Sequence, residues 1–355
     1  MTTPYHELSG RGQLRRLREL ARRALDQFGL DDARFDLLRW AENLGYRVTS
    51  PREAAGAPVG CEHVPGQYML RLHRPGYHTR VEIASELQWL EGLANAGHAV
   101  PRPCVSGEGA WVVESGTSDV PVRYQCTLLR WVQGRVVAGP PKPAHFRRVG
   151  GLLARMHAQS SRWVRPACFD RMRWDWDGLF GYGRVFTLEG DAIWDAVPTS
   201  MRAVWKRVAR RVRLVMERFG AGPDVSGLIH ADLHLANVLF AGAEARAIDF
   251  DECGWGYWIY DLAVALDGWD RQADYRQLRQ ALRDGYDEQR PLPGAHWREL
   301  ETFMAARQLF LGLWVIDTAA TRPQWRRRAP VLLRATTQAL ERYTSPRHSS
   351  RRRRR

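Results

Sequence analysis

The chain has 355 residues, 45% of them hydrophobic, so it is long enough to fold into two lobes with apolar cores. The formal net charge is +14 and is carried almost wholly by arginine, because lysine occurs only at positions 142 and 206. Five scattered cysteines, none in Cys-x-x-Cys spacing, argue against a disulfide framework and against a zinc site, and we expect all five to be buried.

The sequence predicts neither a signal peptide nor a membrane span. The first residues lack the apolar core of a signal peptide, and no stretch approaches the length of a membrane span, so we expect a cytoplasmic protein. Residues 346–355 end in five consecutive arginines. Such a run can attract nucleic acid, membrane phosphates or acidic partners, but it has no interleaved aromatic residues. We interpret it as a disordered tail and expect no nucleic-acid binding elsewhere.

The first third of the chain predicts a small β-rich lobe. Residues 13–28 repeat apolar side chains at a helical period before Gly29, which predicts a leading amphipathic helix. A second helix is expected at residues 81–96, before Gly97. Strands of one antiparallel sheet are expected at residues 35–40, 46–49, 68–73, 111–113 and 122–129.

Residues 134–143, rich in glycine and proline, mark a boundary beyond which the chain is mostly helical. Helices are expected at residues 144–160, 201–219, 257–267, 274–286, 297–318 and 325–343. We therefore predict an α+β, bilobal fold. Residues 1–32 form a helical extension, 33–131 a small antiparallel N-lobe with one main helix, and 132–345 a larger, mostly helical C-lobe.

A polar motif interrupts the helical lobe. Asp232 and Asn237 follow a short apolar strand, and Asp249 comes after a second strand, one hairpin later. In kinase-type active sites an Asp orients the attacking hydroxyl, an Asn on the same loop holds Mg²⁺, and an Asp after a following strand also holds the metal. The order and spacing fit, so we predict Asp232 as the catalytic acid or base, and Asn237 and Asp249 as Mg²⁺ ligands.

Two other interpretations of this motif remain open. His230, Asp232 and His234 alternate, so in an extended strand they would share one face and could bind a transition metal. They could also be polar residues of an ordinary loop. The kinase interpretation is favoured because the motif and the expected strands at residues 228–229, 238–240 and 245–248 coincide.

Several segments resemble the aminoglycoside phosphotransferase and choline kinase superfamily, in particular its stress-response and homoserine kinase-like branch. The segments that carry the resemblance are residues 69–75, 85–90, 128–134, 153–157, 230–239 and 248–263. The resemblance implies a protein-kinase-like fold with a nucleotide-binding N-lobe and a C-lobe that binds the acceptor. It also implies that His230 and Asp261 are structural, Asp261 accepting hydrogen bonds from the backbone of the catalytic loop. A charge at a helix start is the alternative for Asp261.

The resemblance also assigns residues to nucleotide binding, with two departures. Arg71 takes the place of the usual lysine, so it would contact the phosphates and pair with Glu86 on the next helix. Leu129 to Trp131 would form the hinge that binds adenine. No glycine-rich phosphate loop is present, and residues 42–45 are the one candidate to cover the triphosphate.

We therefore expect an enzyme, a phosphotransferase that uses ATP as co-substrate and Mg²⁺ as cofactor. The γ-phosphoryl group would move to a hydroxyl of a small molecule, such as an antibiotic, an amino alcohol or a homoserine-like metabolite, or of a protein Ser or Thr. We expect a monomer or homodimer. The alternative is a nucleotide-binding pseudokinase that regulates a partner. Arg71 and the missing glycine-rich loop support the alternative, whereas the intact Asp232, Asn237 and Asp249 oppose it.

Overall fold

The computed structural model describes residues 5–56, 60–183, 185–322 and 325–345, and the chain divides into two compact units. Unit 1 consists of Met1–Arg135, Val164–Asp170 and Arg246–Asp251. Unit 2 consists of Val136–Trp163, Arg171–Ala245 and Glu252–Arg355. The tail expected at residues 346–355 lies outside the described residues.

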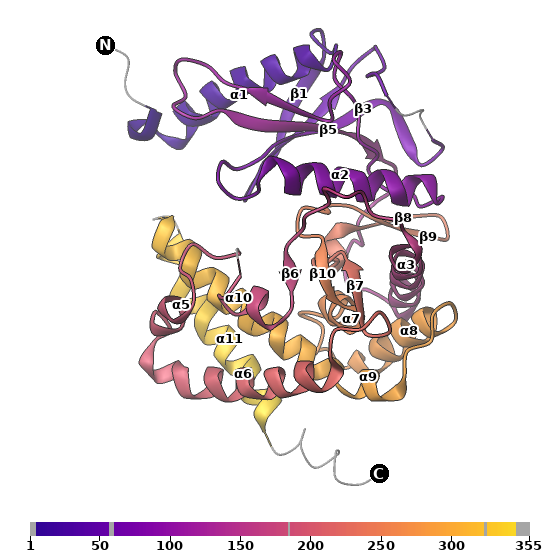
Figure 1. Ribbon diagram of the computed structural model, residues 1–355, viewed down its shortest axis with the longest axis vertical. Coiled ribbons are helices and arrows are strands. Elements are labelled where there is room, and N and C mark those ends of the chain that lie inside the picture. Colours follow the sequence, from indigo (N-terminus) through magenta and orange to yellow (C-terminus); the bar gives the residue numbers. More distant parts are fainter. Residues whose placement is uncertain (1–4, 57–59, 184, 323–324, 346–355) are drawn as a thin grey trace. The chain divides into compact units, whose positions relative to one another are not determined.

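Unit 1 is built on a five-stranded antiparallel sheet with the strand order β1-β2-β3-β5-β4 (Figure 1). The strands are β1 (Arg34–Trp40), β2 (Leu44–Thr49), β3 (His63–Leu72), β4 (Val112–Ser115) and β5 (Tyr124–Val132). The helices are α1 (Gly10–Gln27) and α2 (Arg80–Asn95), preceded by the short η1 (Tyr5–Glu7). The expected sheet and both expected helices are confirmed, although β3 begins earlier because a β-bulge extends its pairing with β5.

The two faces of this sheet have different chemistry. Alternate residues of a strand point to opposite faces, so Leu70 and Leu72 join the apolar core formed with α1, which includes Leu20 and Leu25. Arg71, between them in sequence, points to the other face and forms an ion pair with α2. One strand therefore supplies both the core of unit 1 and a charged group on its opposite face.

Unit 2 is mostly helical and contains two small sheets. Its helices are α3 (Pro143–Arg162), α4 (Trp176–Leu179), α5 (Asp191–Asp195), α6 (Thr199–Phe219), α7 (Trp258–Ala265), α8 (Tyr275–Asp287), α9 (Gly294–Arg298), α10 (Leu300–Thr321) and α11 (Ala329–Thr344). A three-stranded sheet has the order β6-β10-β7, from Arg173–Trp174, Gly254–Tyr257 and Ser226–Ile229. The strands β8 (Val238–Ala241) and β9 (Glu244–Ala247) pair with each other, and the chain passes from unit 2 to unit 1 within β9, at Arg246.

The expected long helices of unit 2 are present, with one correction. The helix expected at residues 297–318 is two helices, α9 and α10, which meet at Glu299. The carboxylate of Glu299 accepts hydrogen bonds from Arg218 at 2.8 Å and from the hydroxyl of Thr302 at 2.7 Å, which fixes the break. The short elements β6, β10, α4 and α5 were not expected, because so few residues show no periodicity.

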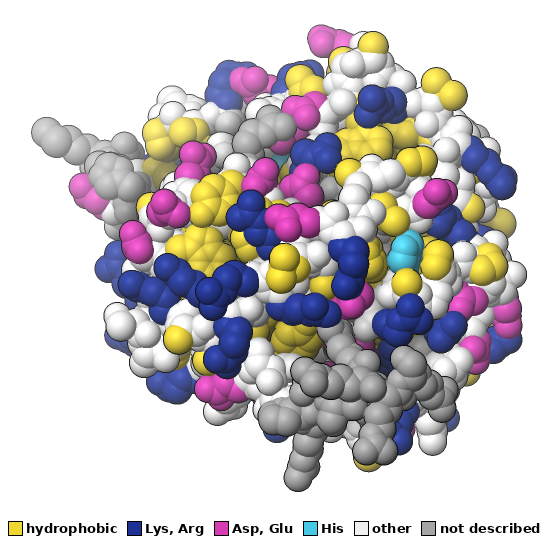
Figure 2. All heavy atoms as spheres, turned by 60° about the horizontal axis from the view of Figure 1, so that its bottom comes forward, with side chains coloured by type: hydrophobic (Ala, Val, Ile, Leu, Met, Phe, Trp, Pro, Cys, Tyr) yellow, Lys and Arg dark blue, Asp and Glu magenta, His cyan; other side chains and the backbone are white. Residues whose placement is uncertain are grey.

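The surface differs from expectation at two cysteines. All five cysteines are free; Cys104, Cys126 and Cys253 are buried as predicted, whereas Cys61 and Cys168 are exposed, so the prediction is wrong for these two. Arginine and lysine side chains are prominent on the face shown in Figure 2, in line with the net charge of +14. Within the described part of the chain, no helix is long and apolar enough to cross a membrane.

Helices α3 and α8 pack backbone against backbone through two glycines. A Cβ atom added at Gly150 of α3 would lie 2.1 Å from the carbonyl oxygen of Leu282, and one added at Gly285 of α8 would lie 1.9 Å from that of Arg147. Neither carbonyl can move without shifting a helix. The close crossing therefore requires glycine at both positions.

We predict that Gly150→Ala lowers the free energy of unfolding by about 1–3 kcal/mol, because the new methyl group overpacks the crossing. Gly151→Ala is the matched control one residue away, where the two closest atoms belong to the flexible side chains of Gln289 and Arg155. Alanine at position 151 should not lower the free energy of unfolding, since alanine stabilises a helix by up to about 1 kcal/mol relative to glycine. Urea denaturation of both variants checks this, and equal losses would contradict the prediction.

Candidate active site

The loop that carries Asp232 is held in a strained conformation in unit 2. It follows β7 and leads through the short η2 (Leu235–Asn237) into β8. Ala231 has a φ of 65°, a left-handed conformation that residues other than glycine adopt at a cost. The backbone N–H of Ala231 donates to Asp261 Oδ1 at 2.6 Å, and that of His230 donates to Asp261 Oδ2 at 2.9 Å. The prediction that Asp261 accepts hydrogen bonds from this loop is confirmed.

Asp261 is itself fixed by buried partners. It lies in the first turn of α7, and its Oδ2 is 3.0 Å from Nε2 of His157 on α3. His157 Nδ1 lies 2.9 Å from the hydroxyl of Tyr286 on α8. A carboxylate only accepts hydrogen bonds, so His157 donates from Nε2 and accepts from Tyr286 at Nδ1 as a neutral ring. Burial lowers the pKa of His157 below its ordinary value, although Asp261 acts to raise it.

Asp232 and Asn237 lie together in this loop. The side-chain nitrogen of Asn237 donates to the backbone oxygen of Asp232 at 2.9 Å and to its Oδ2 at 3.2 Å. The amide oxygen of Asn237 has no hydrogen-bond partner among the described residues. The second carboxylate oxygen of Asp232 accepts from Arg307. Both oxygens of Asp232 therefore have fixed donors, and the oxygen of Asn237 stays available as a ligand.

Arg307 is a candidate functional residue that the sequence analysis missed. It lies in α10, with 6% of the residue exposed, and contacts Asp232, which is 75 positions away in the sequence. Burial alone would lower its pKa, but the neighbouring Asp232 carboxylate helps to raise it, so Arg307 stays charged. Its buried Nε has no hydrogen-bond partner in the described part of the structure. A lone arginine within the apolar run of α10 is the one signal that the sequence offered.

In unit 1, the structure brings Arg71, Glu86 and Asp249 together. Arg71 Nη1 donates to the two carboxylate oxygens of Glu86 at 2.8 and 3.1 Å, and Nη2 donates to Asp249 Oδ1 at 3.3 Å. Burial would lower the pKa of Arg71, but Glu86, Asp251 and Asp249 raise it above its ordinary value. Asp249 has a φ of 65°, like Ala231. A permanent cation is therefore fixed beside a partly exposed carboxylate.

Leu129 and Trp131 lie on the same face of the sheet as Arg71. Leu129 of β5 is opposite Met69 of β3, two residues before Arg71, and residues directly opposite in a sheet share a face. Trp131 is two residues further along β5, and the guanidinium of Arg47 lies 4.9 Å from the centre of its ring. The four residues assigned to nucleotide binding thus gather on one side of unit 1, with Glu86 contributed by α2.

Residues 42–45 comprise the end of the β1–β2 turn and the start of β2, and Asn43 is hydrogen-bonded to the segment that carries Asp249. Asn43 donates from its side-chain nitrogen to Asp251 Oδ2 at 2.7 Å, and its oxygen accepts from the backbone N–H of Arg74 at 2.9 Å. Asp251 Oδ1 lies 3.4 Å from Arg71 Nη1. Asp251 therefore has the hydrogen-bond partners of a structural anchor.

Oxygen ligands suited to Mg²⁺ are present in both units. Mg²⁺ prefers carboxylate and amide oxygens, which Asp249 and Asn237 offer. The alternative clamp of His230, Asp232 and His234 has no support, because no group of three or more His, Cys, Asp or Glu that could hold a metal occurs in the residues that the structure describes. His230 Nδ1 instead accepts from the backbone N–H of Asp232 at 3.3 Å.

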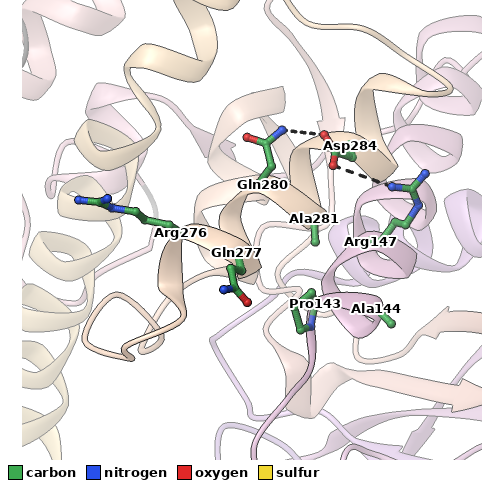
Figure 3. Close-up of a pocket in the computed structure, with 8 residues that line it drawn as sticks. All are labelled: Pro143, Ala144, Arg147, Arg276, Gln277, Gln280, Ala281 and Asp284. Atoms are coloured by element: carbon green, nitrogen blue, oxygen red, sulfur yellow. Dashed lines mark hydrogen bonds and ion pairs between the residues drawn. The ribbon is translucent and has the colours of Figure 1, made fainter.

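A pocket of about 450 Å³ lies between α3 and α8 (Figure 3). It is lined by Pro143, Ala144, Arg147, Arg276, Gln277, Gln280, Ala281 and Asp284. Asp284 accepts from Gln280 at 2.7 Å and lies 3.9 Å from Arg147, as the dashed lines in Figure 3 show. None of the predicted site residues lines this pocket, so it does not mark the candidate active site.

Known proteins share both sequence and fold with this chain. A model of the phosphotransferase enzyme family matches residues 41–303. The homoserine kinase of Gluconacetobacter diazotrophicus is 28% identical over 249 residues, which cover 68% of this chain and 71% of that protein. The structure of a microcompartment-associated aminopropanol kinase is 30% identical, with a TM-score of 0.74, and the match covers 92% of this chain and 97% of that one.

A more distant structure extends the comparison of the fold. An amicoumacin kinase solved with AMP-PNP and Ca²⁺ has a TM-score of 0.68 at 17% identity, over 93% of this chain and 96% of that one. At this identity the likeness concerns the fold alone. Together with the antiparallel sheet and the helical unit, these matches confirm the predicted α+β, kinase-like fold.

We predict that the free energy of unfolding falls as the pH drops below about 6.5, the value for an unperturbed histidine. The unfolded chain takes up a proton at His157 that the folded chain resists, so stability is lost between the unfolded and the lower folded pKa. One proton contributes at most about 1.4 kcal/mol per pH unit. Denaturation at pH 7.5 and 5.5 should show a smaller loss for His157→Gln than for wild type; equal losses would contradict the prediction.

We predict that Arg307→Met lowers the free energy of unfolding by about 3 kcal/mol, because it leaves the partly buried Asp232 carboxylate without its cation. Arg276→Met, at an exposed arginine of α8, is the matched control and should have little effect. Adding Asp232→Asn to Arg307→Met should restore part of the loss, since it removes the unpaired charge. Urea denaturation of wild type, Arg307→Met, Asp232→Asn and the double variant tests the coupling, and strictly additive effects would argue against it.

Proposed function

Because the chain belongs to the phosphotransferase enzyme family, we propose that it transfers the γ-phosphoryl group of ATP to a hydroxyl group of a small molecule, with Mg²⁺ as cofactor. The observation that carries this proposal is the arrangement of Asp232 and Asn237 on a braced loop. Phosphoryl transfer requires the protein to position the reacting groups and to stabilise the charge on the transferred phosphoryl group, and the residues of this loop could do both.

In this proposal Asp232 orients the acceptor hydroxyl and accepts its proton. Arg307 and Asn237 donate to its two oxygens, which fixes the direction of the carboxylate. Asp261 acts through the backbone, because it keeps the loop in the strained conformation that presents Asp232. Asp232 is therefore the residue that would touch the acceptor, whereas Arg307 and Asp261 are positioning residues.

Unit 1 would contribute the nucleotide side of the reaction. Arg71 would contact the phosphates, with Glu86 holding its guanidinium in place. The adenine would bind near Leu129 and Trp131, on the face that Arg71 shares. Asp249 and Asn237 would hold Mg²⁺, which when bound neutralises the charge that builds on the phosphate oxygens.

Relatives support a small acceptor. The similar proteins are named for homoserine, aminopropanol and amicoumacin, all of them small molecules. Homoserine and aminopropanol each carry a hydroxyl and an amino group. We therefore propose an amino alcohol or a hydroxyl-bearing amino acid as acceptor, in preference to a protein Ser or Thr.

One observation favours the pseudokinase alternative. The guanidinium of Arg71 already contacts Glu86, Asp249 and Asp251, so a phosphate would have to compete with carboxylates for it. A protein that binds nucleotide without turnover would be consistent with such a saturated arginine. Turnover measurements separate the two functions.

We predict Mg²⁺-dependent phosphoryl transfer from ATP to at least one member of a panel that includes homoserine, aminopropanol and aminoglycosides. Asp232→Asn should lower kcat by about 10²–10⁴-fold, because it removes the base. Asp224→Asn, at an exposed acid of unit 2, is the control and should turn over like wild type. Labelled-phosphate transfer gives the rates, and calorimetry should show that Asp232→Asn still binds ATP.

Two outcomes would overturn this proposal. Wild type that binds ATP but transfers no phosphate above the level of Asp232→Asn, across the panel and to protein substrates, would support the pseudokinase. Wild type that binds no nucleotide would exclude both functions.

A further inference from the structure

The carboxylate of Asp249 lies between two arginines of unit 1. Arg71 Nη2 is 3.3 Å from its Oδ1, and Arg39 Nη1 is 3.4 Å from its Oδ2. The two arginines differ in exposure, because the side chain of Arg71 is 6% exposed and that of Arg39 is 61% exposed. One cation is thus built into the protein, and the other approaches the same carboxylate from the surface.

A β-bulge places Arg39 on this side of the sheet. The pairing of β1 with β2 runs from Phe35 opposite Val48 to Leu37 opposite Tyr46, and then shifts so that Arg39 is opposite Gly45. Phe35, Tyr46 and Val48 belong to the apolar core on the α1 face. Without the shift, strict alternation would put Arg39 on that same face, since it is two residues from Leu37. The bulge turns it to the other one.

Gly45 connects the two arginines in register. It is opposite Arg39 on β1 and opposite Arg71 on β3, so the three residues form one row across the sheet. Residues opposite one another share a face, and glycine contributes no side chain to that row. The guanidinium groups of Arg39 and Arg71 can therefore both reach Asp249 from neighbouring strands.

The turn after Arg39 is anchored to the segment of Asp249. Asn43 donates to Asp251 Oδ2 at 2.7 Å and accepts from the backbone N–H of Arg74 at 2.9 Å. Arg74 Nη1 also donates to the carboxylate of Glu42 at 2.9 Å. These hydrogen bonds hold the tip of the β1–β2 hairpin beside Asp249 independently of Arg39, so replacing Arg39 leaves the hairpin in place.

Arg39 is held by a weak, largely exposed ion pair, so it can exchange Asp249 for another anion. Its one ion pair among the described residues is with Asp249, at 3.4 Å and largely exposed, and such a pair is worth little. A guanidinium has five N–H donors, and its planar fork matches a phosphate. Arg71, by contrast, is committed to Glu86 and Asp251. Of the two arginines, Arg39 has the donors to spare.

We propose that Arg39 binds the terminal phosphates of the nucleotide and supplies the contact that a glycine-rich loop would otherwise make. This inference rests on the proposed ATP-dependent function. Asp249 holds Arg39 near the phosphate site when no nucleotide is bound.

Calorimetry of ATP and AMP binding tests this inference on wild type, Arg39→Gln and the control Arg34→Gln. Arg34 is an exposed arginine at the opposite end of the same strand. Arg39→Gln should weaken ATP binding tenfold or more while leaving AMP binding unchanged, because AMP lacks the terminal phosphates. Arg34→Gln should bind both nucleotides like wild type. Thermal unfolding confirms that the variants are folded.

A second arm, with EDTA in place of Mg²⁺, separates phosphate contact from an effect on the metal site. A direct contact predicts that the selective loss for ATP persists without metal. Equal weakening of ATP and AMP, unchanged binding of both, or a loss seen only with Mg²⁺ would each overturn the role of Arg39. If wild type binds ATP in the same experiment, the proposed function survives that failure; if it binds no nucleotide, both fall.

Discussion

The shape of the candidate catalytic loop depends on one buried carboxylate. Asp261 accepts the backbone N–H groups of His230 and Ala231, and so offsets the cost of the left-handed conformation at Ala231. His157 then fixes Asp261 from α3, and Tyr286 fixes His157 from α8. The close packing of α3 on α8, which requires glycine at positions 150 and 285, is thereby linked to the direction of a loop that neither helix contains.

In unit 1, charged groups are buried close to an apolar core. Side chains alternate between the two faces of β3. Leu70 and Leu72 therefore pack in the apolar core with α1, whereas Arg71 lies on the opposite face and pairs with Glu86 of α2. Glu86 makes this burial tolerable, because an unpaired arginine at that depth would be costly. The departure from the usual lysine is accommodated by two further carboxylates, Asp249 and Asp251.

The parts of the site that could be predicted are those in which local spacing decides the contact. Asp232 and Asn237 are five residues apart on one loop, and their hydrogen bond follows from that spacing. Arg71 and Glu86 were paired by the resemblance to the superfamily, and the structure shows the contact. Arg307 is 75 residues from Asp232 and could be placed beside it only by the packing of α10. Arg39 was missed because the β-bulge before it places its side chain on the face opposite to the one that strict alternation along β1 would predict. The break at Glu299 depends on partners from α6, which no local pattern reveals.

The two units differ in how their buried ionisable groups depend on pH. Buried lysines shift their pKa readily and can lose their proton, whereas a guanidinium surrounded by carboxylates keeps its charge at every pH at which the protein is folded. Arg71 therefore keeps its positive charge beside the proposed phosphate-binding site. In unit 2, by contrast, the Asp261 carboxylate that holds the candidate catalytic loop is itself held by the neutral ring of His157, which can take up a proton at low pH. A buried histidine of α3 thus connects the pH of the surroundings to the geometry of the candidate catalytic loop.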